Sequence, residues 1–119
     1  MTTTPPTLRR GDVVLVLFPY SDLKTAKPRP ALIVQTDNLE SGLPQVVVAM
    51  ITSRLFRANH PSRVLIKLDS PAGKESGLLT DSVVMTDNLA TISEIALDRV
   101  IGKIPMEEVD KALKHTLGL

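Results

Sequence analysis

The chain has 119 residues, of which 43% are hydrophobic and 23% charged, a length and composition typical of one globular domain with its own core. The lack of cysteine excludes disulfides, thiolate catalysis and zinc–thiolate sites, and no apolar run approaches the ~20 residues of a transmembrane helix, so we expect a cytoplasmic protein with no membrane partner. The formal net charge of +1 indicates no partner by itself.

The first part of the chain predicts a tail followed by three strands. We expect a flexible N-terminal tail over residues 1–9 and a single domain over residues 10–119. β-branched apolar runs predict strands over residues 13–18, 31–35 and 45–51. The third run is dense in valine and apolar on both faces, which favours a central position in a sheet.

The second part predicts three more strands and a helix. The strands are expected over residues 63–68, 81–85 (running on toward residue 92) and 100–104, with a Ser-, Pro- and Gly-rich loop over residues 69–77. Gly102 inside the last strand indicates a bulge or a close backbone approach. Apolar residues at fourfold spacing predict an amphipathic C-terminal helix that Gly118 terminates. These elements indicate a mainly β (α+β) fold, a small closed antiparallel barrel with helices on its outside.

Arg29 lies between Pro28 and Pro30 at the start of the second predicted strand. Pro30 restricts Arg29 to an extended conformation, and Pro28 stiffens the approach because its own φ is fixed. An arginine restrained in this way can bind a phosphate with little loss of freedom. The same pattern also fits a solvated arginine at the start of a strand.

Thr52 and Ser53 end the third predicted strand, and Arg54 follows them. If the second and third strands pair antiparallel, the start of one lies near the end of the other, which places Arg29 beside both hydroxyls. This arrangement predicts a cationic and hydroxyl site. A turn that the two hydroxyls cap is the alternative.

Positive charge is concentrated in the first part of the chain. Residues 1–68 carry nine basic and four acidic side chains, whereas residues 69–119 carry five basic and nine acidic ones. Two stretches without acidic residues contain Lys24, Lys27 and Arg29, and then Arg54, Arg57, Arg63 and Lys67. If these stretches meet in the fold, they form a patch that attracts polyanions; otherwise the charges scatter over the surface.

Metal and cofactor chemistry have little support in the sequence. The two histidines, His60 and His115, are far apart in the chain and lack clustered carboxylates, so we expect both on the surface and no metal site. There is no glycine-rich phosphate loop, no dinucleotide fingerprint and no nucleophile elbow. We therefore expect no cofactor.

Several segments together resemble the MazF/PemK family of toxins. These are Gly11 to Val16 followed by Phe18-Pro19, then Arg29 to Val34, Ile51-Thr52-Ser53, Gly77 to Val84, and Ile101 to Ile104. The likeness spans roughly residues 10–118. The resemblance implies that the chain folds as an SH3-like barrel and forms a homodimer. It also implies that the protein is a metal-independent, sequence-specific endoribonuclease that cuts single-stranded RNA. It also implies a cognate antitoxin with an acidic disordered segment.

The resemblance also implies roles for particular residues. Arg29 and Thr52 stand at the positions of the family's catalytic pair. Asp87 stands where some members use an aspartate, either as the catalytic base or as a group that orients a neighbour. Asn88 stands where family members often carry glutamine, followed at Ala90 by a position that is often arginine. The reaction would be attack of the ribose 2′-hydroxyl on the adjacent phosphorus, giving a 2′,3′-cyclic phosphate and a 5′-hydroxyl.

Substrate contacts are expected from a few further side chains. Tyr20 lies on a loop and can stack on an exposed base, whereas Phe18 and Phe56 are expected in the core. The remaining predicted RNA-binding residues are Lys27, Ser53, Arg54 and Asn88.

Two other functions remain open at this point. The same barrel is used by toxins that resemble CcdB, which poison DNA gyrase and have no need of Arg29 and Thr52 at these positions. The C-terminal residues carry the gyrase contact in such toxins, and here they have the pattern of a packed amphipathic helix. A nucleic-acid-binding barrel that has lost catalysis is the other alternative.

Overall fold

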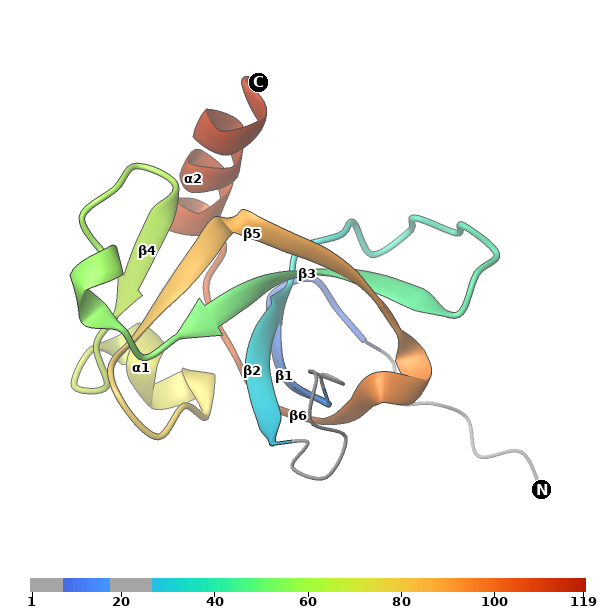
Figure 1. Ribbon diagram of the computed structural model, residues 1–119, viewed down its shortest axis with the longest axis horizontal. Coiled ribbons are helices and arrows are strands. Elements are labelled where there is room, and N and C mark those ends of the chain that lie inside the picture. Colours follow the sequence, from blue (N-terminus) through green and yellow to red (C-terminus); the bar gives the residue numbers. More distant parts are fainter. Residues whose placement is uncertain (1–7, 18–26) are drawn as a thin grey trace.

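The computed structural model describes residues 8–17 and 27–119, and one antiparallel sheet of six strands is its centre (Figure 1). The spatial order of the strands is β4-β5-β3-β2-β1-β6, and every neighbouring pair is antiparallel. The strands are β1 Asp12–Leu17, β2 Pro28–Ile33, β3 Gln45–Thr52, β4 Arg63–Ile66, β5 Ser82–Ser93 and β6 Leu97–Lys103. The predicted mainly β, antiparallel architecture is therefore confirmed, and β3 is central as expected.

The expectation of a fully closed barrel is wrong for the described residues. The edge strands β4 and β6 are not hydrogen-bonded neighbours, so the sheet curls but stays open. Helix α1 (Pro71–Ser76) follows β4 in the chain and packs against β6. The helix therefore occupies the place where the two edges would have to meet.

The sheet bends where β3 pairs with β5. Ala49 lies opposite Leu89, but the next residue, Met50, lies opposite Met85. Residues 86–88 of β5 are therefore an insertion in the ladder, and such an irregularity increases the local bend and twist of a sheet. Because of this bend, the long strand β5 pairs with β3 on both sides of the insertion and also pairs with β4 (Figure 1).

Both faces of the curled sheet are buried. One cluster includes Val13, Leu32, Ile51 and Val84 and continues to Val109 on helix α2 (Glu107–Leu117). The other lies on the opposite face, because alternate residues of a strand point to opposite sides; it contains Val14, Val16, Ala31, Ile33, Val46, Val48 and Ile92. The near-continuous apolar runs of the sequence reflect this burial on two sides.

The helices partly match the prediction. Helix α2 begins at Glu107 and ends at Leu117, and Gly118 caps it with a positive φ of 71°, as expected. Residues 69–77 do not form only a loop, because α1 lies within them. The Ser70 hydroxyl accepts a hydrogen bond from the backbone N–H of Gly73 at 3.0 Å, and Pro71 suits the first turn. The residues that suggested a loop are therefore the helix's own caps.

The expected close approach at Gly102 is confirmed. A Cβ at this position would collide with the backbone of Glu75 and Ser76 at the end of α1. The absence of a side chain at Gly102 thus allows the backbones of β6 and α1 to approach closely. This approach determines where the segment after α1 begins relative to β6. None of the helices in the described ranges is long and apolar enough to cross a membrane.

Candidate active site

A groove of about 550 Å³ opens where β2 begins and β3 ends. It is bounded by β1, β2, the end of β3, the segment after α1 and strand β6. Its lining residues are Leu15, Pro28, Arg29, Pro30, Ile51, Thr52, Ser53, Arg54, Gly77, Leu78, Leu79, Thr80, Ser82, Arg99 and Ile101. Segments that are distant in the chain therefore form one concave surface.

The strand register explains why Arg29 and Thr52 line the same groove. Strands β2 and β3 pair antiparallel, and the last pair at this end is Ala31 opposite Met50. Arg29 and Thr52 are each two residues beyond that pair, so both lie at the same end of the β2–β3 ladder. Arg29 is exposed and Thr52 is half-buried. The antiparallel pairing that the sequence analysis assumed is thus confirmed.

The Thr52 hydroxyl also has the turn role that was the alternative interpretation. Its Oγ1 accepts a hydrogen bond from the backbone N–H of Arg54 at 3.2 Å. A hydroxyl that accepts such a bond keeps its own proton for donation. The bond fixes Thr52 at the groove and leaves it able to donate to a bound oxygen.

The groove is cationic. Among the described residues, its lining includes three arginines (Arg29, Arg54 and Arg99), the hydroxyl residues Thr52, Ser53, Thr80 and Ser82, and no aspartate or glutamate. Within residues 8–17 and 27–119, none of these arginines forms an ion pair. Planar guanidinium groups bind phosphate with paired donors, so the groove suits a phosphodiester.

Arg99 is a groove residue that the sequence analysis missed. The sixth strand was expected from residue 100, but it begins at Leu97 and includes Arg99. Arg99 and Ile101 are two residues apart on β6, and both line the groove. Residues 97–101 do not alternate between apolar and polar side chains, and the β1–β6 ladder contains two register shifts, so the sequence pattern carried no clear signal for this position.

Asp87 and Asn88 lie elsewhere. Both belong to the inserted residues of β5 and are exposed, and neither lines the groove. The Asp87 carboxylate pairs with Arg63, with 2.8 Å between Oδ2 and Nη2. The hydrogen bond from Arg63 lowers the pKa of Asp87 below its ordinary value. A carboxylate held in this way is a weaker base.

The other predicted contacts are divided between the groove and its surroundings. Ser53 and Arg54 line the groove. Lys27 is exposed just before β2 and is not among the lining residues. Tyr20 and Phe18 lie outside the described residues.

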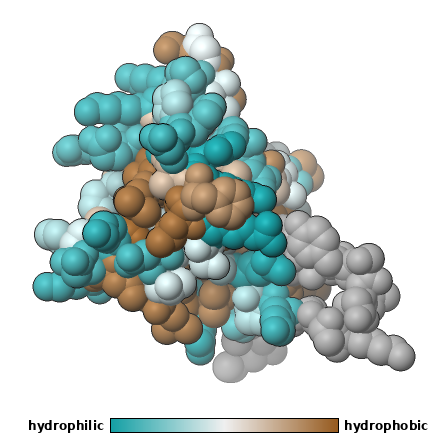
Figure 2. Space-filling model, turned by 60° about the vertical axis from the view of Figure 1, so that its left-hand side comes forward, coloured by the Kyte–Doolittle hydropathy of each residue, from teal (hydrophilic) through white to brown (hydrophobic). Residues whose placement is uncertain are grey.

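Phe56 is not in the core, contrary to expectation. Its side chain is 78% exposed on a 3₁₀ turn, η1 (Leu55–Arg57), and the Arg57 guanidinium lies 5.7 Å from its ring centre. The turn follows directly on the end of β3, so the chain is already on the surface at Phe56. Figure 2 shows hydrophobic side chains gathered on the face that includes η1 and β4, where the exposed apolar residues are Leu55, Phe56 and Leu65.

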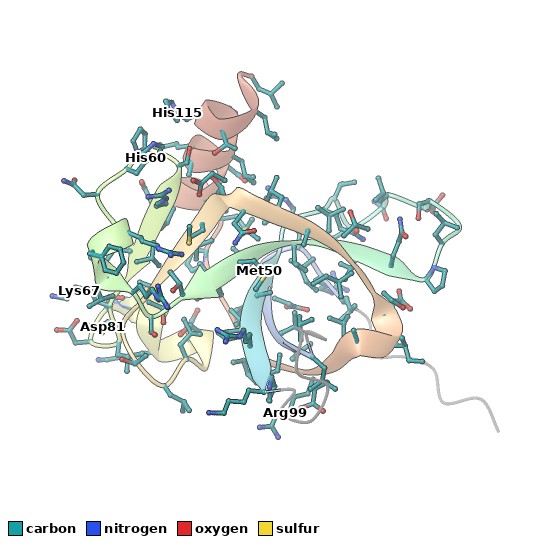
Figure 3. The ribbon with its side chains drawn as sticks, viewed as in Figure 1. Met50, His60, Lys67, Asp81, Arg99 and His115 are labelled. Carbon is teal, nitrogen blue, oxygen red and sulfur yellow. The ribbon has the colours of Figure 1, made fainter. Side chains whose placement is uncertain are left out.

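The two histidines are both exposed, as expected, but they are neighbours in space. Their ring centres are 6.1 Å apart in an edge-to-face arrangement between the turn before β4 and helix α2 (Figure 3). His60 Nδ1 accepts a hydrogen bond from the backbone N–H of Ser62 at 3.0 Å. This contact closes the turn before β4, and neither ring lines the groove.

Comparison with known proteins identifies related chains. A family model described as "PemK-like, MazF-like toxin of type II toxin-antitoxin system" matches residues 9–117. An endoribonuclease from mycobacterial species is 26% identical with a TM-score of 0.68, and the match covers 95% of this chain and 93% of that chain. A mycobacterial endoribonuclease in complex with its cognate antitoxin is 25% identical with a TM-score of 0.70, covering 94% and 96%.

A more distant structure has the same fold. MazF from Deinococcus radiodurans is 19% identical to this chain with a TM-score of 0.68, and the match covers 95% of this chain and 98% of that chain. At this identity the similarity concerns the fold alone.

Proposed function

Because this chain belongs to the PemK-like, MazF-like toxins of type II toxin–antitoxin systems, we propose that it is a sequence-specific endoribonuclease that cuts single-stranded RNA without a metal ion. The observation that carries the proposal is the groove that Arg29 and Thr52 line together with two further arginines, with no carboxylate from the described part of the chain. The similar mycobacterial chains are endoribonucleases by name. We place the reaction in the cytoplasm, where the RNA is.

The proposed reaction is an internal transesterification. The ribose 2′-oxygen forms a bond to the adjacent phosphorus, and the bond from phosphorus to the 5′-oxygen breaks. The proton leaves the 2′-hydroxyl for a base, and the leaving 5′-oxygen receives a proton. The products are a 2′,3′-cyclic phosphate and a 5′-hydroxyl.

Arg29 and Thr52 have separate roles in this proposal. The Arg29 guanidinium neutralises the charge that builds on the pentavalent phosphorane, with two parallel donors on its oxygens. The Thr52 hydroxyl donates to another phosphate oxygen. Charge stabilisation is the main role of Arg29, because a side chain with a pKa above ~12 is a poor acid at neutral pH.

The remaining predicted residues bind or orient. Ser53 and Arg54 contact the RNA within the groove, and Lys27 and Asn88 contact it along its path beyond the groove. Tyr20, which lies outside the described residues, stacks on an exposed base. Asp87 has an orienting role, since its carboxylate holds Arg63 and its pKa is lowered. The assignments of Ser53, Arg54, Lys27 and Asn88 follow the position of each side chain relative to the groove.

The proposed regulator is a cognate antitoxin with an acidic disordered segment. A groove that three arginines line attracts an acidic peptide as well as RNA. One similar mycobacterial endoribonuclease was solved with its cognate antitoxin. Occupation of the groove by such a peptide would exclude RNA.

The proposed assembly is a homodimer formed through an apolar surface beside α2. A groove of about 500 Å³ lies there, and four leucines of its lining are at least 36% exposed. They are Leu39, Leu89, Leu117 and Leu119. Exposed apolar surface of this kind marks an interface.

The function is tested by incubating the purified protein with mixed-sequence RNA in excess EDTA. We expect cleavage that leaves 5′-hydroxyl ends, detected by direct labelling of the products with a polynucleotide kinase. Arg29→Ala should abolish the cleavage. Arg9→Ala, which removes an exposed cation outside the groove, is its matched control and should cleave normally. Intact RNA together with trapped gyrase–DNA complexes would contradict the nuclease and favour a gyrase poison.

A further inference from the structure

Arg99 has no part in the reaction above, yet it lines the same groove. Strand β6 places it opposite Leu15 of β1, and Leu15 is itself opposite Pro30 of β2. Figure 3 shows Arg99 at the end of the sheet where β2 begins. The register of three strands therefore brings Arg99 to the end of the sheet where Arg29 lies.

The spacing of the strands separates the points on the backbone from which the two arginine side chains start. β1 lies between β2 and β6, so the backbones of Arg29 and Arg99 are two inter-strand distances apart, about 9–10 Å. Two like charges that converge on one phosphate repel each other, whereas charges that start from separate strands can each meet a phosphate of their own. The RNA backbone is a chain of such phosphates.

Arg99 is among the cations of the described residues that form no ion pair. Arg10, Arg63 and Lys111 are each paired with a carboxylate, at 2.6 Å, 2.8 Å and 3.4 Å respectively. Arg99 has no such pair within the described ranges. Its neighbours Leu15 and Ile101 in the groove are apolar, whereas Glu94 and Asp98 line a second, smaller groove that Arg99 also borders. Its charge is therefore available to an anion that enters the groove.

We propose that Arg99 binds a backbone phosphate of the RNA next to the phosphate at which Arg29 and Thr52 act. This inference rests on the proposed nuclease function and adds to it a residue that sets the register of the RNA in the groove. Arg99 contributes to substrate binding and leaves the bond-breaking step to the other two residues.

The first test measures binding without cleavage. The probe is a mixed-sequence RNA in which 2′-fluoro groups replace the 2′-hydroxyls, so that the nucleophile is absent. For a single-stranded nucleic acid each phosphate contact adds about 0.7 to the slope of log K against log salt. We expect Arg99→Gln to reduce this slope by about 0.7 and Arg99→Lys to retain it.

The matched control is Lys103→Gln, which removes one exposed positive charge from the same strand but outside the groove. It should leave the slope unchanged. A second test follows cleavage of ordinary RNA, where Arg99→Gln should raise KM about tenfold and leave kcat unchanged. The melting temperature of each variant establishes that the fold is retained.

Several outcomes would overturn the role of Arg99. These are an unchanged salt slope, a fall in kcat at constant KM, or weaker binding of the antitoxin peptide with RNA binding unchanged. Failure of the nuclease proposal looks different, because then the wild-type protein leaves RNA intact in the cleavage assay. The 2′-fluoro probe still measures the contribution of Arg99 to binding in that case.

Discussion

At the scale of single residues, Arg29 and Thr52 are positioned in different ways. Arg29 is restrained through its backbone, because Pro30 excludes the helical conformation and Pro28 precedes it. Thr52 is restrained through its side chain, because its hydroxyl accepts the Arg54 backbone N–H. A change at Thr52 therefore affects the turn as well as any bound phosphate.

Two substitutions of Thr52 distinguish the contribution of its hydroxyl to the cleavage rate from that of its side-chain volume. Thr52→Val removes the donor and keeps the volume, so we expect a loss of about 10²–10³ in the single-turnover cleavage rate. Thr52→Ser keeps the hydroxyl and should retain most of the rate. If Thr52→Val cleaves as fast as the wild type, the hydroxyl has no part in catalysis.

Asp87 gives a prediction about pH. Its folded-state pKa is lowered, so the pair with Arg63 stabilises the fold above the unfolded pKa and the stabilisation disappears as the pH falls through the folded value. We expect Asp87→Asn to be less stable than the wild type at pH 7, with a difference that closes as the pH drops below about 4. Urea midpoints measured across this range are the test.

The salt dependence provides the control for this pair. Both side chains are partly exposed, so the difference at pH 7 should be small and should shrink at high ionic strength. A stability difference between wild type and Asp87→Asn that is independent of pH would contradict the ion pair as its cause.

At the scale of elements, the short helix α1 and strand β6 determine one side of the groove. Gly77, which ends α1, has φ 73° and lies against the backbone of Ile101. Residues 77–80 then line the groove. The position of this rim therefore depends on how closely the helix and the strand approach each other.

Gly102→Ala tests that dependence. The new Cβ would collide with the backbone of Ser76, which cannot move as a flexible side chain would, so we expect a loss of about 1–3 kcal/mol in the free energy of unfolding. Gly42→Asn is the control, because nothing lies within 4 Å of a Cβ there and asparagine tolerates its φ of 77°. Chemical denaturation of both variants gives the comparison, and equal stabilities would contradict the close packing.

At the scale of the whole molecule, the strands were largely predictable and the connections between them were not. Runs such as residues 45–51 predicted their strands because burial on both faces leaves few polar positions. The antiparallel register placed Arg29 and Thr52 correctly at one groove. Arg99 was missed because one sequence does not give the start of a strand reliably, and the insertion at residues 86–88 left no local signal for where Asp87 would lie.

The proposed homodimer is also a property of the whole molecule. Leu117→Glu places a charge on the apolar surface beside α2, so we expect the variant to be monomeric under conditions where the wild type is dimeric. Leu43→Glu is the control, since Leu43 is exposed but is not part of that surface. Light scattering coupled to gel filtration measures both, and a dimeric Leu117→Glu would place the interface elsewhere.

The central claim is that the Arg29 guanidinium stabilises the transition state of RNA cleavage in the groove. Its most direct test is the single-turnover cleavage rate of Arg29→Ala in excess EDTA, at protein concentrations that saturate the RNA. We predict a rate at least 10²-fold below that of the wild type. A rate equal to that of the wild type would contradict the claim.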